Sequence, residues 1–136
     1  MKVITTMIED EVYEAVNENG NKLSIDMRSP ELKKAQSPPE ILLSAVAGCG
    51  AVDIVLMLKK RRKIIHNFTI ETIGKRREDH PKRFTEIHCI YILESPDVNE
   101  EEFEKAASLS LEKYCTVAAT LNITVTHEIQ IIRPSE

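Results

Sequence analysis

The feature that most constrains the fold is an apolar run from Ile41 to Leu58, in which only Ser44, Asp53 and the glycines at 48 and 50 lie outside the apolar set. As a helix it is hydrophobic on nearly every side, so it must be surrounded. Eighteen residues span about 27 Å at the helical rise, which is close to the thickness of a bilayer core. Asp53 near the bilayer centre would cost roughly 2.5 to 3.5 kcal/mol. We therefore expect no membrane span, but a sheet on one side of this helix and a second subunit on the other.

Length and charge narrow the function classes further. The chain has 136 residues, the size of one domain covering residues 1–136. Its net charge of −4 argues against a nucleic-acid partner. The segment Met1–Met7 lacks the long apolar stretch of a signal peptide, so we expect a cytoplasmic protein.

Alternation, helix caps and turn residues predict an α+β chain. The Asn-rich segment 17–21 marks a turn, and Ser37 followed by Pro38 and Glu40 marks a helix start. The five cations of Lys59–Lys63 suit a helix C-terminus. The predicted strands are Val3–Ile8, Val12–Val16, Leu23–Met27, Phe68–Ile73, Phe84–Leu93 and Ile123–Ile132, and the predicted helices follow Ser37, follow Asn99 as far as Leu111, and cover Tyr114–Leu121.

Three widely spaced cysteines are the best candidates for chemistry, because a reducing compartment disfavours structural disulfides. Cys49 lies between two glycines, which open the helix backbone to a ligand or another chain, although a small inert core residue is the alternative. Cys115 has Lys113 two positions before it, and a packed thiol is again the alternative. Cys89 lies inside a predicted strand, so we expect it to be structural.

Motifs for other chemistries are absent from the sequence. There is no CxxC or HxxxH, and His88 and Cys89 are adjacent, so a strand points them to opposite faces. GxGxxG, GxxxxGK[ST] and GxSxG are missing too. We expect neither a metal nor an organic cofactor.

Two stretches together resemble a known family. Ser37-Pro-Pro-Glu40-Ile-Leu-Leu-Ser44-Ala-Val-Ala-Gly-Cys49 is similar to the first cysteine helix of the OsmC/Ohr proteins, and Leu109-Ser110-Leu-Glu-Lys113-Tyr114-Cys115 is similar to their second cysteine box. The segment from Gly74 to Thr85 resembles the less characterised OsmC-like branch. The resemblance implies an OsmC-like fold, with antiparallel sheets wrapping central hydrophobic helices in an intertwined homodimer.

The resemblance also implies an activity, the thiol-dependent reduction of organic hydroperoxides to alcohols. Cys49 would attack the O–O bond and become a sulfenic acid, and Cys115 would resolve it to a disulfide that a small or protein-bound dithiol reduces. The alternatives are a non-catalytic protein that binds a hydrophobic ligand or senses redox state, and a structural domain with inert thiols.

The sequence departs from the family pattern at the cation that activates the first cysteine. The best-studied peroxidases of the family place an Arg beside that thiolate, and a Glu ten residues before the cysteine orients the Arg. Here position 39 is Pro, and Glu40 lies nine residues before Cys49. Arg28 is the only upstream Arg, and the Lys75–Arg77 loop supplies other cations. We therefore expect Cys49 to be a slow peroxidatic thiol.

Overall fold

The computed structural model describes residues 1–135, which form two compact units. The first unit is Met1–Leu42 and the second begins at Leu43. Glu136, the last residue of the expected domain, lies outside the described residues. Each unit is described by itself.

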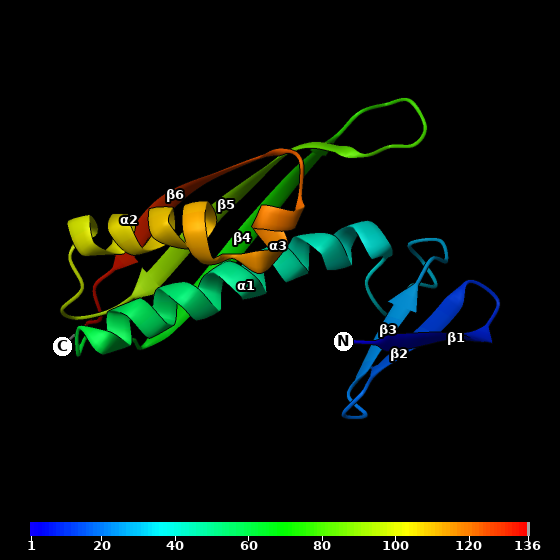
Figure 1. Cartoon of the computed structure of the whole chain (residues 1–136), viewed down its shortest axis with the longest axis horizontal. Helices are drawn as coiled ribbons and strands as arrows, with labels where there is room; N and C mark the ends of the chain where they lie inside the picture. Colours follow the sequence, from blue (N-terminus) through cyan, green and yellow to red (C-terminus); the bar gives the residue numbers. More distant parts are fainter. Residues whose placement is uncertain (136) are drawn as a thin grey trace. The chain divides into compact units, whose positions relative to one another are not determined.

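The first unit is a three-stranded antiparallel meander of β1 (Val3–Glu9), β2 (Val12–Asn17) and β3 (Lys22–Asp26), as predicted (Figure 1). The predicted turn joins β2 to β3: the Asn17 side chain accepts hydrogen bonds from the backbone N–H groups of Asn19 and Asn21, at 3.1 and 2.8 Å. Gly20 takes a positive φ of 84° there, which a residue without Cβ adopts at little cost.

The apolar run forms the long helix α1 (Pro38–Lys60), which begins in the first unit and continues through the second. Helix α1 starts after Ser37 as predicted, and Glu40 forms one half of the expected capping box, because the backbone N–H and the hydroxyl of Ser37 donate to Glu40 Oε1 at 3.0 and 2.7 Å. Within residues 1–135, α1 is the one helix long and apolar enough to cross a membrane, a test of length and composition that core helices also pass.

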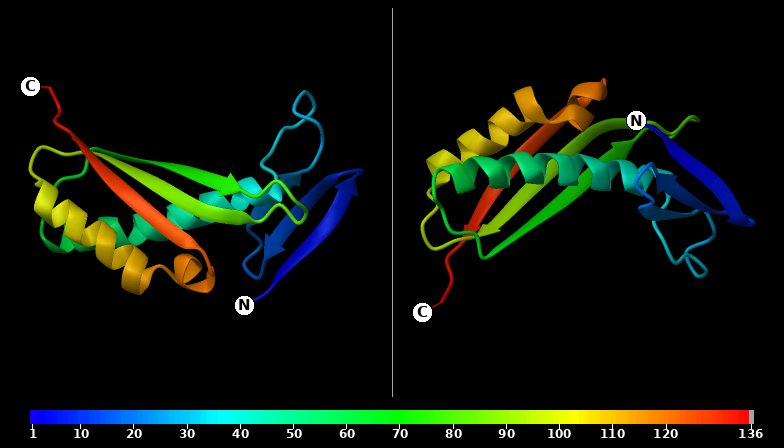
Figure 2. Two further views of the ribbon diagram at one scale, coloured as in Figure 1. Left: turned by 90° about the horizontal axis from the view of Figure 1, so that it is seen from above. Right: turned by 60° about the horizontal axis from the view of Figure 1, so that its bottom comes forward.

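The second unit holds a sheet of β4 (Asn67–Arg76), β5 (Phe84–Glu94) and β6 (Thr124–Ile132), in the order β4-β5-β6. The predicted hairpin of β4 and β5 is confirmed, and this pair is antiparallel. The expectation of wholly antiparallel sheets is wrong for β5 and β6, which are parallel. The helical segments between these two strands lead the chain back to the end of the sheet where β5 begins (Figure 2). Strand β6 therefore runs in the same direction as β5, as such a crossover requires.

The crossover consists of three helical pieces. Helix α2 (Glu100–Leu109) opens with a capping box in which Asn99 and Glu102 each accept the other's backbone N–H. A π-helical turn, η1 (Ser110–Tyr114), follows, and then the short helix α3 (Thr116–Thr120). The helix predicted over Tyr114–Leu121 thus starts two residues later, because the π turn occupies the residues before Cys115.

The core of the second unit lies between its helices and one face of its sheet. Alternate residues of β5 are fully buried, and α1 contributes a buried row at every fourth position. This core comprises Ile87, Cys89, Tyr91 and Leu93 of β5, Val46, Ile54 and Leu58 of α1, Phe103, Ala106 and Ala107 of α2, and Val98. The predicted helix-on-sheet packing of α1 is therefore confirmed for one face of the helix.

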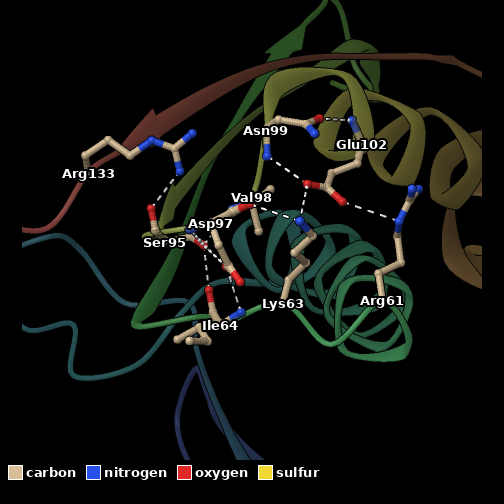
Figure 3. A network of polar contacts seen from close by, with 9 residues as sticks. All are labelled: Arg61, Lys63, Ile64, Ser95, Asp97, Val98, Asn99, Glu102 and Arg133. Carbon is tan, nitrogen blue, oxygen red and sulfur yellow. Dashed lines mark hydrogen bonds and ion pairs between the residues drawn. The ribbon is translucent and has the colours of Figure 1, made fainter.

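A polar network closes the basic end of α1 (Figure 3). Arg61 and Lys63 lie 3.3 and 3.2 Å from the buried carboxylate of Glu102. Burial by itself would raise the pKa of Glu102, but the Asn99 N–H and the two cations hold it below its usual value. The buried Ser95 hydroxyl donates to the Ile64 carbonyl at 2.5 Å. Two of the five clustered cations therefore serve as partners for a carboxylate of α2.

Candidate thiol site

All three cysteines are free thiols in the second unit. Cys49 lies on α1 and is partly exposed, whereas Cys89 on β5 and Cys115 after the π turn are buried, with exposed fractions of 0% and 1%. In the single chain, Cys49 is therefore partly open to solvent, whereas Cys89 and Cys115 are enclosed by their surroundings.

The π turn and α3 hold Cys115 in place. Its backbone N–H donates to the Ser110 carbonyl at 2.7 Å, and its sulfur accepts the N–H of Ala118 at 3.4 Å as the N-terminal cap of α3. Single π turns interrupt helices at functional sites in many proteins. Here the extra residue brings the chain from α2 directly into the segment that carries Cys115.

Cys49 and Cys115 are neighbours in the folded chain. Burial raises the pKa of Cys115 well above its ordinary value, and the adjacent Cys49 thiol raises it further. Cys115 is therefore protonated at neutral pH in the dithiol state. The pairing that the family resemblance implied is compatible with this arrangement of one accessible and one buried thiol.

Gly50, the residue after Cys49, lies against the side chain of Tyr91. A Cβ at Gly50 would stand 2.9 Å from the Tyr91 hydroxyl oxygen and 3.7 Å from Ser110 Oγ. The Ser110 hydroxyl in turn lies 3.3 Å from both the Gly50 carbonyl and Asp53 Oδ2. The open backbone expected beside Cys49 is thus occupied, at Gly50, by the chain's own Tyr91.

We expect Gly50→Ala to lower the stability of the wild-type protein. In a protein that already carries Tyr91→Phe, we expect the same Gly50→Ala change to raise the stability. Ala gains about 1 kcal/mol over Gly inside a helix, but crowding a packed core costs typically 1 to 3 kcal/mol. Without the hydroxyl, the nearest ring carbon, Cζ, is 3.8 Å away, an ordinary contact. Denaturant unfolding of the four proteins at one concentration measures the change of sign, and equal effects in both backgrounds would contradict it.

Cys89 lies where the sequence predicted, inside β5 and in the core. Burial raises the pKa of its thiol, while the Tyr91 and Thr72 hydroxyls beside it act in the opposite direction. Tyr91 itself escaped the sequence analysis. The sequence feature that could have identified Tyr91 is its position two residues after Cys89, which places both side chains on one face of a strand.

Four of the residues considered around the activation of Cys49, which are Arg28, Glu40, Lys75 and Arg77, have other partners. Two nitrogens of Arg28 donate to the buried Asp26 carboxylate at 3.0 and 2.7 Å, and this pairing raises the pKa of Arg28. Lys75 pairs with Glu86 at 3.3 Å, and Arg77 Nε donates to the Pro81 carbonyl at 2.6 Å. Glu40 caps α1, as described above. Each of these side chains already has a structural partner.

Among residues 1–135, no group of three or more His, Cys, Asp or Glu side chains is arranged to hold a metal ion. His127 Nε2 instead lies 2.6 Å from Glu104, and His88 lies 2.6 Å from Thr126 through Nδ1. These pairs link β6 to α2 and β5 to β6.

The chain is an α+β protein that carries one thiol on its long apolar helix and a second thiol next to it. The family model described as OsmC-like protein matches residues 31–130, and this chain belongs to that family. Protein YhfA of Escherichia coli is 31% identical over 134 residues, which cover 97% of this chain and 98% of YhfA.

Solved structures share the fold. A hypothetical protein from Aquifex aeolicus is 30% identical with a TM-score of 0.80, over 96% of each chain. The OsmC-like protein from Mycoplasma pneumoniae is 19% identical with a TM-score of 0.83, over 96% of each chain. The organic hydroperoxide resistance protein OhrB of Bacillus subtilis is 17% identical with a TM-score of 0.64, over 96% of this chain and 98% of its own. The predicted family and fold are confirmed.

Proposed function

We propose that this protein is a thiol peroxidase that reduces organic hydroperoxides to alcohols. The observation that carries the proposal is the pairing of a partly exposed thiol, Cys49, with a buried protonated thiol, Cys115. An accessible thiol meets the peroxide, while a buried neighbour is protected from it and is placed to resolve the product. Membership in a family that includes organic hydroperoxide resistance proteins supports the same assignment.

The proposed reaction has three steps. The Cys49 thiolate attacks the terminal peroxide oxygen, the O–O bond breaks, and the alcohol leaves with a proton, so that sulfur is oxidised to a sulfenic acid. Cys115 then attacks the Cys49 sulfur, forming the disulfide and releasing water. A dithiol from outside the protein finally reduces the disulfide by exchange. Free thiols and the need for a dithiol support a cytoplasmic location.

We also infer that the protein works as a homodimer and that residues 1–136 form one domain. Only 22% of the most apolar 18-residue window of α1 is buried within the chain. An exposed stripe at helical spacing runs along α1 and consists of Ala45, Gly48, Val52 and Leu56. In the expected intertwined dimer, a second copy of the chain covers this stripe. The single domain is supported by α1, which is continuous across the boundary between the units.

A turnover assay with cumene hydroperoxide and dihydrolipoamide tests the activity. We expect many turnovers per chain, and slower consumption of hydrogen peroxide, which gains nothing from an apolar surrounding. Because Lys75 and Arg77 of the same unit are held by Glu86 and by the Pro81 carbonyl, we expect slow chemistry at Cys49 rather than a fast peroxidase. No consumption of either peroxide would overturn the proposal.

A redox sensor is the second candidate. The observation that favours it is that Lys75 and Arg77, cations of the same unit as Cys49, have partners of their own. A sensor would consume one equivalent of peroxide per chain and then stop in the presence of dihydrolipoamide. Stoichiometric consumption in the assay above therefore selects this function over the peroxidase.

A further inference from the structure

Tyr91 has the largest fully buried side chain among the described residues, and its hydroxyl meets no nitrogen or oxygen partner there, while the thiol of Cys89 lies beside it. Its ring packs on Phe68, with the ring centroids 6.0 Å apart. An unsatisfied buried hydroxyl costs about 1 to 3 kcal/mol, whereas Phe would fill the same space without that cost. A thiol sulfur is a weak acceptor, so the hydroxyl is poorly satisfied in the resting fold and needs another explanation.

The position of the hydroxyl points to the thiol pair. It lies against Gly50, the residue that follows Cys49, and the same spot on α1 faces Ser110, whose carbonyl holds the backbone of Cys115. Burial raises the pKa of Tyr91 far above its ordinary value, and the thiols of Cys89, Cys115 and Cys49 raise it further. The phenol is thus a protonated donor packed against Gly50, and of the three thiols that act on it Cys89 acts most strongly, followed by Cys115 and Cys49.

We propose that the Tyr91 hydroxyl is the proton donor to the oxygen of the Cys49 sulfenic acid when Cys115 displaces that oxygen as water. The proposal rests on the peroxidase function proposed above and adds a residue to its resolving step. In the dithiol state no oxygen is present at Cys49, so the hydroxyl has the weakly accepting Cys89 sulfur beside it and no oxygen acceptor. Oxidation of Cys49 provides that partner.

The step balances with one tyrosine as relay. The Cys115 sulfur attacks the Cys49 sulfur, the S–S bond forms and the S–O bond breaks. The departing hydroxide takes the Tyr91 proton and leaves as water, while the Tyr91 oxygen takes the proton of the Cys115 thiol in the same event. The Cys49 sulfur is reduced from the sulfenic to the disulfide level, and the Cys115 sulfur is oxidised to it.

This assignment explains how a buried Cys115 with a raised pKa can attack at neutral pH. A free thiolate would need to form first in an apolar site, which is unfavourable. Concerted transfer through the phenol avoids both a buried thiolate and a buried phenolate. General acid catalysis of this kind contributes typically 10²- to 10⁴-fold to a rate.

The test uses Tyr91→Phe, with Tyr114→Phe as the matched control, since Tyr114 precedes Cys115 but is exposed. One equivalent of cumene hydroperoxide is mixed with each reduced protein, and quenched samples are analysed by mass spectrometry for the sulfenic acid, trapped with dimedone, and for the disulfide. We expect Tyr91→Phe to form the sulfenic acid at the wild-type rate and the disulfide roughly 10²-fold more slowly. Tyr114→Phe should match the wild type in both steps.

A second measurement separates proton donation from a structural displacement of Cys115. An aromatic disulfide reagent is used to place a mixed disulfide on Cys49, and Cys115 then releases the coloured aromatic thiolate, a leaving group that needs no proton. We expect Tyr91→Phe to slow this release far less than it slows disulfide formation from the sulfenic acid. Equal slowing of both reactions would mean that the hydroxyl only positions Cys115, and would overturn the proposal.

The remaining outcomes are also decisive. Disulfide formation at the wild-type rate in Tyr91→Phe would overturn the role of Tyr91 and leave the peroxidase standing. A wild-type protein that forms no sulfenic acid would overturn both proposals together. We expect the thermal midpoint of Tyr91→Phe to equal or exceed that of the wild type, and a marked fall would show that the hydroxyl is already bonded in the dithiol state.

Discussion

A Cys49→Ser variant is expected to lose peroxide consumption entirely, whereas Cys115→Ser should stop after one equivalent with a sulfenic acid on Cys49. The difference follows from their surroundings, because Cys49 is partly exposed and Cys115 is buried beside it. A hydroxyl cannot replace a thiolate as nucleophile toward an O–O bond, so the loss at Cys49 should reach the uncatalysed rate. Without Cys115 no neighbouring thiol removes the sulfenic acid, which dimedone can then trap.

Cys89→Ser is the control for both variants, because Cys89 is fully buried in the core and is expected to be structural. We expect it to retain turnover. Peptide mapping of the oxidised wild type should find a bridge between Cys49 and Cys115. A bridge that contains Cys89, or full turnover in Cys115→Ser, would show that the resolving thiol has been assigned wrongly.

The second large effect concerns assembly. We expect a homodimer whose unfolding midpoint rises with protein concentration, since the folded state gains stability from mass action. The exposed stripe on α1 includes Val52 and Leu56, which are 59% and 53% exposed in the single chain. Large apolar side chains aligned on one helix face are unfavourable in water and favour burial against a second copy.

The double variant Val52→Asp/Leu56→Asp should be a monomer at micromolar concentration. Each unpaired carboxylate taken out of water costs on the order of several kcal/mol, so the dissociation constant should rise by more than about 10²-fold. Ile132→Asp, which makes the same change at a 50% exposed position at the end of β6, is the control and should remain dimeric. A monomeric wild type in sedimentation at micromolar concentration would contradict the prediction.

Several features of the chain could be read from local sequence alone. Ser37 and Pro38 mark the start of α1, Asn99 and Glu102 mark the start of α2, and the Asn-rich segment at 17–21 marks the turn between β2 and β3. Each signal depends on hydrogen bonds between residues at most four positions apart. Such bonds form wherever the segment lies in the fold, so the sequence suffices to predict them.

Only part of the candidate site could be predicted from local sequence. The residue patterns around Cys49 and Cys115 allowed either reactive or inert thiols, and the two were paired by the family resemblance and not by their spacing. Lys59–Lys63 suggested a capped helix end, but the structure adds the ion pairs of Arg61 and Lys63 with Glu102. These residues lie far apart in the sequence, so their ion pairs depend on where α2 packs in the fold.

The sequence by itself determined the elements, their order, the apolar character of α1 and the resemblance to the family. The tertiary structure decided that β6 lies parallel to β5 and that the Tyr91 hydroxyl lies beside Gly50 and the thiols. The physical reason is the range of the interactions. Helix caps and turns are settled within a few residues, whereas strand direction and contacts between β5 and α1 depend on how the whole core packs, which no local pattern encodes.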